Sequence, residues 1–242
     1  ITMAPYTKED KNDLPIASKN TNILKFMPLT ESLIKTNKLR QATHSYLACI
    51  SFVDHQVGRV LDALKESPYK DNTIVILWSD HGYHIGEKGT FQKHSLWQRA
   101  THVPLIISAP GIGKGKTCSK PVELLDIYPS LIDLCMLPKN AKNEGTSLKP
   151  LMINPNGKWD KYAITTYRKQ SKHCKADKIP YAKDTSHSII GSQYHYILYS
   201  DGSEELYDLK EDPNEWRNLA KILEFNNQKT KMKNALKVQL KQ

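Results

Sequence analysis

The apolar run TIVILW at residues 73–78 constrains the fold most, because it ends abruptly in the polar stretch SDHGYHIGEKGTFQK at residues 79–93. A short, continuous and β-branched run is typical of a strand that is buried on both faces. In open α/β sheets, ligands bind beyond the carboxyl ends of such strands. We therefore expect a buried strand from residue 72 to residue 78, with a functional site in the polar stretch that follows it.

The polar stretch contains residue types that suit an anion or a metal ion. Asp80 and His81 directly follow the predicted strand, and Gly82 permits a sharp turn or a close approach to a ligand. A carboxylate beside an imidazole suits a divalent cation or an acid/base pair. The loop could bring Lys93 back beside Asp80 and His81, where its ammonium would act as a point charge for an oxyanion. The alternative is that Asp80 caps a turn and the rest is solvated loop, and the spacing leaves both interpretations open.

The elements around this stretch predict an α/β layer. A helix is expected from Thr36 to Glu66, because apolar residues recur at three- and four-residue spacing: Tyr46, Ile50, Val53, Val57, Val60 and Leu64. A second buried strand is expected from His102 to Ser108, and a helix from Glu123 to Leu134, although Pro129 lies near its middle. This order of elements favours a largely parallel sheet.

The predicted pattern of secondary structure changes after about residue 140. Short antiparallel strands are expected over residues 162–167, 188–190, 194–199 and 205–209, with Asp201-Gly202 as a hairpin turn. Residues 169–184 form a polar connection, and the tail from Asn214 is expected to be helical and basic. We therefore divide the chain into residues 1–140 and a smaller unit, residues 141–242.

Composition excludes several classes of protein. The net charge of +10 over 242 residues comes from lysines spread along the chain, which we interpret as solvated faces or as attraction for an anionic substrate. No aromatic residues interleave with the basic ones, so nucleic acid is not an expected partner. No run approaches the ~20 apolar residues of a membrane span. The four cysteines form no CxxC pair and are expected to be buried free thiols: Cys49, Cys118, Cys135 and Cys174.

Longer motifs resemble a known family. The segment SDHGYHIGEKGTFQKHSLWQRATHVPLIISAPG resembles the middle of the sulfatases, which belong to the alkaline-phosphatase superfamily. Further segments resemble the same family in the expected order: YLACISFVDHQVGRVLDAL, PVELLDIYPSLIDLCMLP, EGTSLKPLM and ELYDLKEDPNEWRNLA. The resemblance covers roughly residues 40–220. Within the family, DHG, ATHVPL and LYDLKEDPNEW are most similar to the subgroup of iduronate-2-sulfatase and many bacterial sulfatases.

The resemblance implies a fold and a set of site residues. Residues 1–140 would be the C-terminal part of an alkaline-phosphatase-like mixed sheet flanked by helices, and residues 141–242 a small antiparallel α+β subdomain with a terminal helix. Asp80 and His81 would bind the metal, Lys93 would contact the sulfate, and Lys93 and His81 would be catalytic. The metal would be Ca²⁺, although the imidazole of His81 leaves Mn²⁺ or Zn²⁺ open.

Several residues near these positions receive weaker assignments. His84, His94 and Trp97 would line the substrate site, and Glu87 could shape the pocket or orient Lys93. Two residues of the smaller unit, Tyr167 and His187, could reach the same place, whereas His102 is expected to be a structural histidine with satisfied hydrogen bonds.

The chain departs from the family in one respect. Sulfatases use a nucleophile, formylglycine, that is made from Cys or Ser in a C/S-x-P/A-x-R motif, and no cysteine or serine here begins such a motif. The paired aspartates that complete the metal site are also not found, and a calcium ion takes roughly 6–8 oxygen ligands. We therefore expect a C-terminal fragment whose N-terminal half supplies both. Alone, it should be inactive or nearly so, and poorly soluble, because a half-sheet exposes an edge and an apolar face.

Three functions stay open at this point. The first is a sulfatase acting on a sulfate ester such as a sulfated glycan, an aryl sulfate or a small metabolite. The second is a phosphatase or phosphonate monoester hydrolase of the same superfamily. The third is a non-catalytic binding protein of this fold. The resemblance implies a periplasmic, secreted or lysosomal location.

Overall fold

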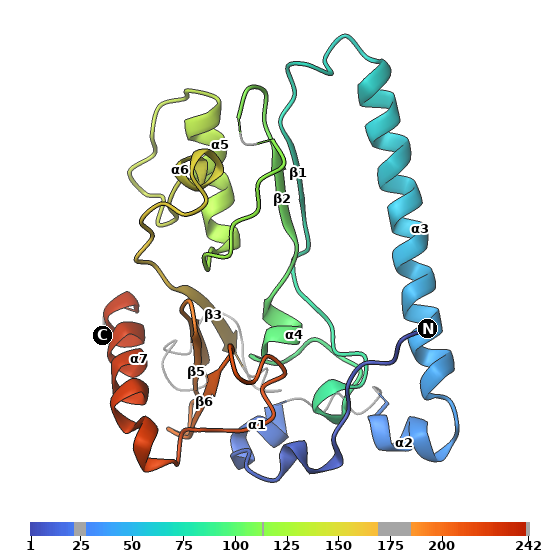
Figure 1. Ribbon diagram of the computed structural model, residues 1–242, viewed down its shortest axis with the longest axis vertical. Coiled ribbons are helices and arrows are strands. Elements are labelled where there is room, and N and C mark those ends of the chain that lie inside the picture. The colour runs from blue at the N-terminus through green and yellow to red at the C-terminus, as the bar shows by residue number, and fades with distance from the viewer. Residues whose placement is uncertain (22–27, 113, 169–184, 241–242) are drawn as a thin grey trace, which may run out of the picture.

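The computed structural model describes residues 1–21, 28–112, 114–168 and 185–240 (Figure 1). The predicted polar connection at 169–184 and Cys174 lie outside these residues. The N-terminal segment contributes three short helices: η1 (Lys8–Lys11), α1 (Ile16–Thr21) and α2 (Thr30–Lys35). They precede the one long helix in the described part of the chain.

That long helix, α3, extends over Leu39–Glu66 and confirms the predicted helix. Its apolar stripe is not buried: Ile50, Val53 and Val60 are all exposed. In Figure 1, α3 stands to one side and is separated from β1 and β2 along most of its length. The described residues therefore form the helix predicted by the pattern but do not cover its apolar face.

The strand before the polar stretch is β1 (Val75–Trp78), which pairs with β2 (Leu105–Ser108). The two strands run antiparallel, with Val75 opposite Ser108 and Trp78 opposite Leu105, so the expectation of parallel pairing is wrong here. The expected burial is also wrong for the end of β1, because Trp78 is about half exposed. The 26-residue connection between the two strands, residues 79–104, contains α4 (Gln98–Thr101) and leaves room for the chain to reverse direction.

The predicted helix at 123–134 is present as η3 (Leu124–Asp126) followed by α5 (Ile127–Leu134). Because α5 begins only at Ile127, Pro129 lies in its first turn, where the amide proton that proline lacks would have no partner within the helix. A short helix, α6 (Lys149–Ile153), follows.

The smaller unit is a four-stranded antiparallel sheet in the order β3-β4-β5-β6. Its strands confirm the predicted ones: β3 (Ala163–Arg168), β4 (Thr185–Ile190), β5 (Tyr194–Leu198) and β6 (Glu204–Asp208). Gly202, with φ of 85°, occupies the predicted turn between β5 and β6. The terminal helix α7 spans Asn226–Gln239, preceded by η4 (Leu223–Phe225), and so begins later than expected.

Two apolar clusters lie on this sheet. One joins the sheet to α7 and is centred on Ile189, Tyr196, Leu206 and Leu236. The other joins the sheet to the N-terminal part of the chain, because Leu14, Leu96 and Trp97 pack with residues of β5 and β6. The stretch that follows β1 is therefore anchored in a core that it shares with the smaller unit.

Three cysteines, Cys49, Cys118 and Cys135, are free thiols as expected, but they are exposed, so the expected burial is wrong for them. Within the described residues, no helix is both long enough and apolar enough to cross a membrane.

Candidate functional site

The loop after β1 folds back on itself because Gly82 permits close backbone contact. Its N–H donates to the carbonyl oxygen of Ala100 at 2.8 Å, and a Cβ at this position would lie 2.1 Å from the carbonyl oxygen of Arg99. On the next residue, the Tyr83 hydroxyl donates to the carbonyl of Phe91 at 3.1 Å. The segment from 81 to 84 thus lies against the segment from 91 to 100, which brings residues a dozen positions apart together.

Lys93 and His81 meet at this junction. The Lys93 Nζ lies 2.5 Å from the His81 Nε2, and the His81 Nδ1 lies 2.7 Å from the carbonyl oxygen of Gly82. A carbonyl oxygen only accepts, so Nδ1 carries the proton and Nε2 presents its lone pair to the Lys93 ammonium. The predicted return of Lys93 to Asp80 and His81 is thus seen in the structure.

Asp80 completes this group at its exposed edge. Its Oδ1 accepts the His81 N–H at 3.1 Å, and its Oδ2 lies 3.7 Å from the His81 Nε2. The carboxylate is largely exposed. Asp80, His81 and Lys93 together present one carboxylate, one imidazole lone pair and one ammonium.

The donor set suits one side of a metal site. A ligating histidine typically donates its other ring N–H to a carbonyl or carboxylate, as the His81 Nδ1–H does. Ligand atoms lie roughly 2.0–2.6 Å from a divalent cation, so Asp80 Oδ2 and His81 Nε2 are close enough together to share one. Across the described residues, no group of three or more His, Cys, Asp or Glu side chains could hold a metal ion. Of these four residue types, Asp80 and His81 are the two that the geometry of this group brings together as possible ligands.

His94 extends the group toward the smaller unit. Partial burial lowers the pKa of His94, and the nearby positive charge of Lys93 acts in the same direction. Its ring meets Tyr167 of β3 edge-on, with 6.4 Å between the ring centroids. His187 instead lies beside Thr166, which precedes Tyr167 in the strand and so points to the opposite face of the sheet. Of the two residues expected to reach from the smaller unit, Tyr167 contacts His94 and His187 faces away from it.

Three other candidates lie beneath the surface. His84 is fully buried and Trp97 is 3% exposed, so neither side chain reaches the surface of the site in this structure. Glu87 is buried too, where it accepts the N–H of Ile85 and pairs with Arg99 at 3.1 Å. Glu87 therefore holds the loop together through Arg99 rather than by contact with Lys93.

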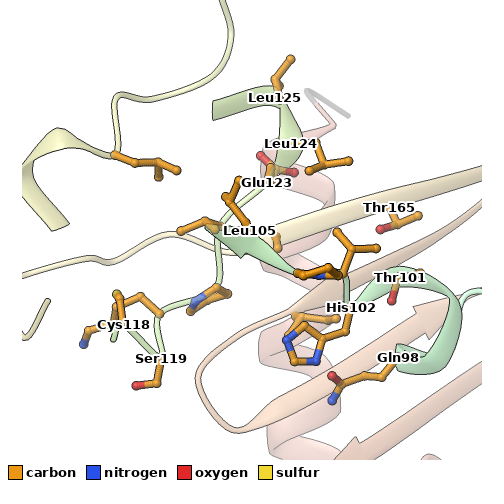
Figure 2. Close-up of a pocket in the computed structure, with 18 of the residues that line it drawn as sticks. Gln98, Thr101, His102, Leu105, Cys118, Ser119, Glu123, Leu124, Leu125 and Thr165 are labelled. Carbon is orange, nitrogen blue, oxygen red and sulfur yellow. The ribbon is translucent and has the colours of Figure 1, made fainter. Parts of the chain in front are cut away.

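A cavity of about 1260 Å³ opens beside the group. Asp80, His81, Lys93 and Ser95 lie on its wall, which continues past β2 to β3 and α6. Figure 2 shows Gln98, Thr101 and His102, together with Thr165 of β3, among the side chains that line it. His102 is exposed on this wall, and its expected role as a structural histidine stays a prediction.

Sequence reasoning missed the buried charges behind the loop. The Glu205 carboxylate of β6 is fully buried and accepts hydrogen bonds from Trp97 Nε1 at 2.8 Å, Tyr207 at 2.7 Å and Tyr199 at 3.0 Å. Burial raises its pKa, and these donors oppose that rise. Trp97 is distant from Glu205 in sequence, and tyrosines near a glutamate in a strand form no recognisable motif, so no local sequence pattern predicts the network.

A second buried group lies beside the first. Glu215 accepts the N–H of Gln98 at 2.8 Å and contacts the His195 ring, while Lys88 pairs with Asp10 at 2.8 Å and donates to the Glu215 carbonyl. Burial pushes the pKa of Glu215 upward, but His195 and Lys88 outweigh it and the net shift is downward. Glu215 belongs to the DPNEW segment, which the resemblance singled out without assigning it a role.

The site therefore consists of a carboxylate–imidazole pair and a lysine that follow a strand of an α/β structure, residue types that suit an anion or a metal ion. Two family profiles match the chain. That of the sulfatases covers residues 3–136, and that of the C-terminal region of N-sulphoglucosamine sulphohydrolase covers residues 86–242. The chain belongs to the sulfatase family.

Curated relatives agree with this assignment. A sulfatase of Formosa agariphila is 47% identical over 93% of this chain, and an arylsulfatase of Clostridium perfringens is 31% identical over 89%. Human arylsulfatase K is 34% identical over 72% of the chain. The chain spans 41%, 42% and 33% of these relatives' own lengths. Bacterial sulfatases are among them, whereas the resemblance to iduronate-2-sulfatase stays a prediction.

Solved structures confirm the fold. One contains its substrate D-glucosamine-2-N,6-O-disulfate and aligns with a TM-score of 0.74 at 26% identity, covering 92% of this chain and 44% of its own. The phosphonate monoester hydrolase of Agrobacterium radiobacter aligns with a TM-score of 0.70, also at 26% identity, covering 78% and 39%. The mixed α/β architecture with a small antiparallel unit is thus that of the C-terminal part of sulfatases.

Proposed function

We propose that the complete protein is a metal-dependent sulfuric ester hydrolase and that this chain supplies the lysine and part of the metal site. The observation that supports this most is the contact between Lys93 and His81 beside Asp80, at the end of β1, in a chain of the sulfatase family. Lys93 places a positive charge where an anionic ester would need one.

The roles of Lys93 and His81 are linked through one lone pair. When bound, a divalent cation would act as a Lewis acid that polarises an oxygen of the sulfate. Asp80 and His81 would hold it, and we propose Ca²⁺, with Mn²⁺ or Zn²⁺ as alternatives. The His81 Nε2 cannot ligate a cation and accept a proton from Lys93 at once, so ligation leaves the Lys93 ammonium with all three donors for the sulfate. His81 and Lys93 are therefore the proposed catalytic residues.

The substrate is proposed to be a sulfated glycan. His94 and Tyr167 place two aromatic rings beside Lys93, and the faces of such rings suit the apolar C–H face of a sugar ring. The similar structure with a bound glucosamine disulfate supports this class of substrate. The net charge of +10 favours an anionic polymer over a neutral one.

The remaining parts are proposed to come from an N-terminal half of the same protein. That half would contribute the formylglycine nucleophile and the other metal ligands. It would also cover the exposed apolar residues of α3 and the end of β1, among them Val53, Val60 and Trp78. The length that this chain leaves unmatched in its relatives is enough for such a half. By family membership, we propose a periplasmic, secreted or lysosome-like location.

The test is an assay of the complete protein with 4-nitrophenyl sulfate and with a sulfated glucosamine. Lys93→Ala should lower kcat/KM by about 10²–10³-fold, the range seen when one preorganised charge-stabilising group is removed. Asp80→Asn should weaken the affinity for Ca²⁺ measured by calorimetry. Lys70→Ala, which removes an exposed lysine outside the cavity, is the matched control and should leave both quantities unchanged.

A second candidate, a phosphonate monoester hydrolase, is favoured by the alignment with the Agrobacterium radiobacter enzyme. The two differ in the preferred ester, so the same preparation is offered a phenylphosphonate monoester. A higher kcat/KM for the phosphonate than for either sulfate would replace the sulfatase proposal. Binding of a sulfated sugar without turnover of any ester would instead identify a non-catalytic binding protein.

A further inference from the structure

His84 lies next to the site but does not open into it. Its side chain is fully buried, and it contacts the lysine-bearing segment at two points. The His84 backbone N–H donates to the carbonyl of Gln92 at 2.9 Å, and its ring Nε2 lies 2.8 Å from the Ser95 hydroxyl. The two contacts fall on either side of Lys93 and His94, so one residue holds both ends of this short segment.

Ser95 transmits that restraint to Lys93. The Ser95 N–H donates to the carbonyl oxygen of Lys93 at 2.8 Å, which closes a tight turn between them. Ser95 is also part of the cavity wall, together with Asp80, His81 and Lys93. Because only one residue separates them and the turn is hydrogen-bonded, the backbone of Lys93 follows any movement of Ser95.

The ring of His84 is itself held in place. Trp97 meets it at 88°, with 5.9 Å between the ring centroids, and burial lowers the pKa of His84 to about 4. The imidazole is therefore neutral near pH 7. Its Nδ1 is buried and has no hydrogen-bond partner among the described residues. Orphaned buried N–H groups are rarer than orphaned acceptors, so the proton belongs on Nε2, where it is donated to Ser95.

We infer that His84 is a positioning residue: it holds Ser95, and through Ser95 the backbone of Lys93, where the Lys93 ammonium reaches His81. The inference rests on the proposed function, because it assigns His84 and Ser95 to the hydrolysis in which Lys93 takes part. It also replaces the expected contact of His84 with substrate by an indirect role. Misplacing a catalytic group by about 1 Å can cost about 10²-fold in rate, so the restraint affects turnover.

The test compares variants of the complete protein at Ser95 and His84. Ser95→Ala removes the hydroxyl without enlarging the side chain, and Ser95→Thr keeps it. His84→Gln retains an N–H donor, so it guards against a variant such as His84→Ala that fails to fold. Tyr83→Phe is the matched control, because it removes a hydrogen bond between the same two segments that involves neither His84 nor Ser95.

Ser95→Ala should lower kcat for 4-nitrophenyl sulfate by about 10–100-fold, whereas Ser95→Thr and Tyr83→Phe should stay near the parent value. The thermal midpoint should differ little between Ser95→Ala and Tyr83→Phe, which separates positioning from loss of stability. A kcat of Ser95→Ala within twofold of that of Tyr83→Phe would overturn the inference.

A second readout does not depend on turnover. In the metal-free protein, the rate at which acetic anhydride acetylates Lys93, measured by mass spectrometry relative to Lys70, should rise severalfold in Ser95→Ala because the ammonium is no longer held against His81. An unchanged ratio overturns the inference whether or not the protein hydrolyses any ester. If the parent protein hydrolyses no ester but the Lys93/Lys70 acetylation ratio changes in Ser95→Ala, the proposed function is overturned and the positioning of Lys93 by Ser95 is supported.

Discussion

Replacement of Gly82 by alanine should separate the two segments that form the site. The added Cβ would lie 2.1 Å from the Arg99 carbonyl oxygen and 3.0 Å from its carbonyl carbon, where ordinary contacts begin at 3.4 Å. Both neighbours are backbone atoms, so relief requires a main-chain shift of more than about 1 Å. Overpacking of this kind costs about 1–3 kcal/mol, and a shift of about 1 Å at a reacting group costs about 10²-fold in rate.

The assay measures the thermal midpoint and kcat/KM of the complete protein with 4-nitrophenyl sulfate. Gly58 provides the matched control: it lies inside α3, and a Cβ there would meet nothing within 4 Å. Gly58→Ala should stabilise the protein by about 0.5–1 kcal/mol, because alanine loses less backbone freedom in a helix, and it should leave kcat/KM unchanged. The same substitution should thus shift stability in opposite directions at the two glycines.

The reasoning is refuted if Gly82→Ala and Gly58→Ala give the same midpoint and the same kcat/KM. Equal activity with a lower midpoint at Gly82 would show that the segments part without moving Lys93. That outcome would contradict the link between the Gly82 contact and the Lys93–His81 distance.

Two buried side chains, Trp97 and His84, and the exposed face of α3 give three further predictions. Trp97→Phe removes a donor to the Glu205 carboxylate and should lower the free energy of unfolding by about 1.5–3 kcal/mol with KM unchanged. The control Trp216→Phe, at an exposed residue, should change the free energy of unfolding little. A changed KM at equal stability would place Trp97 in the substrate site. Folding lowers the pKa of His84 from 6.5 to about 4, so between these pH values the unfolded chain binds more protons than the folded protein. The free energy of unfolding should therefore fall by roughly 3 kcal/mol as the pH drops from 6.5 to 4. Urea denaturation at a series of pH values measures this, and an equally steep pH dependence for His84→Gln would contradict it. The isolated chain should bind an apolar dye through the exposed face of α3, and co-expression with the upstream half should abolish that binding; a dye-free isolated chain would argue against an uncovered face.

Local patterns predicted the elements well. The three- and four-residue spacing gave α3, and the alternating pattern with the Asp201-Gly202 turn gave β5 and β6. The meeting of Asp80, His81 and Lys93 followed from a strand end, a glycine and a short loop. Each of these depends on residues that are close in the chain, where periodicity and turn chemistry carry the information.

Pairing direction and burial were harder to predict. β1 and β2 were expected to be parallel because the order helix, strand, strand, helix favoured a largely parallel sheet, but the long connection between them reverses the chain. The Lys88–Asp10 pair joins residues 78 positions apart, and Trp97 finds Glu205 at a separation of 108. A sequence pattern does not encode which distant polar groups will pair in the core. The burial of His84 and Trp97 could therefore be seen only in the structure.

The position of the site explains why its supports come from the smaller unit. Lys93 lies on an irregular loop, and a loop holds a charge in place only if packing restrains it. Here the restraint comes from Glu205, which binds Trp97, and from Glu215, which binds the backbone of Gln98. Both carboxylates are buried and hydrogen-bonded, so removing either would leave its partner groups unsatisfied in the core. Residues of β6 and of the segment after it therefore restrain the loop that follows β1 without contacting Lys93, and both carboxylates belong to ELYDLKEDPNEW, one of the segments that resemble the family.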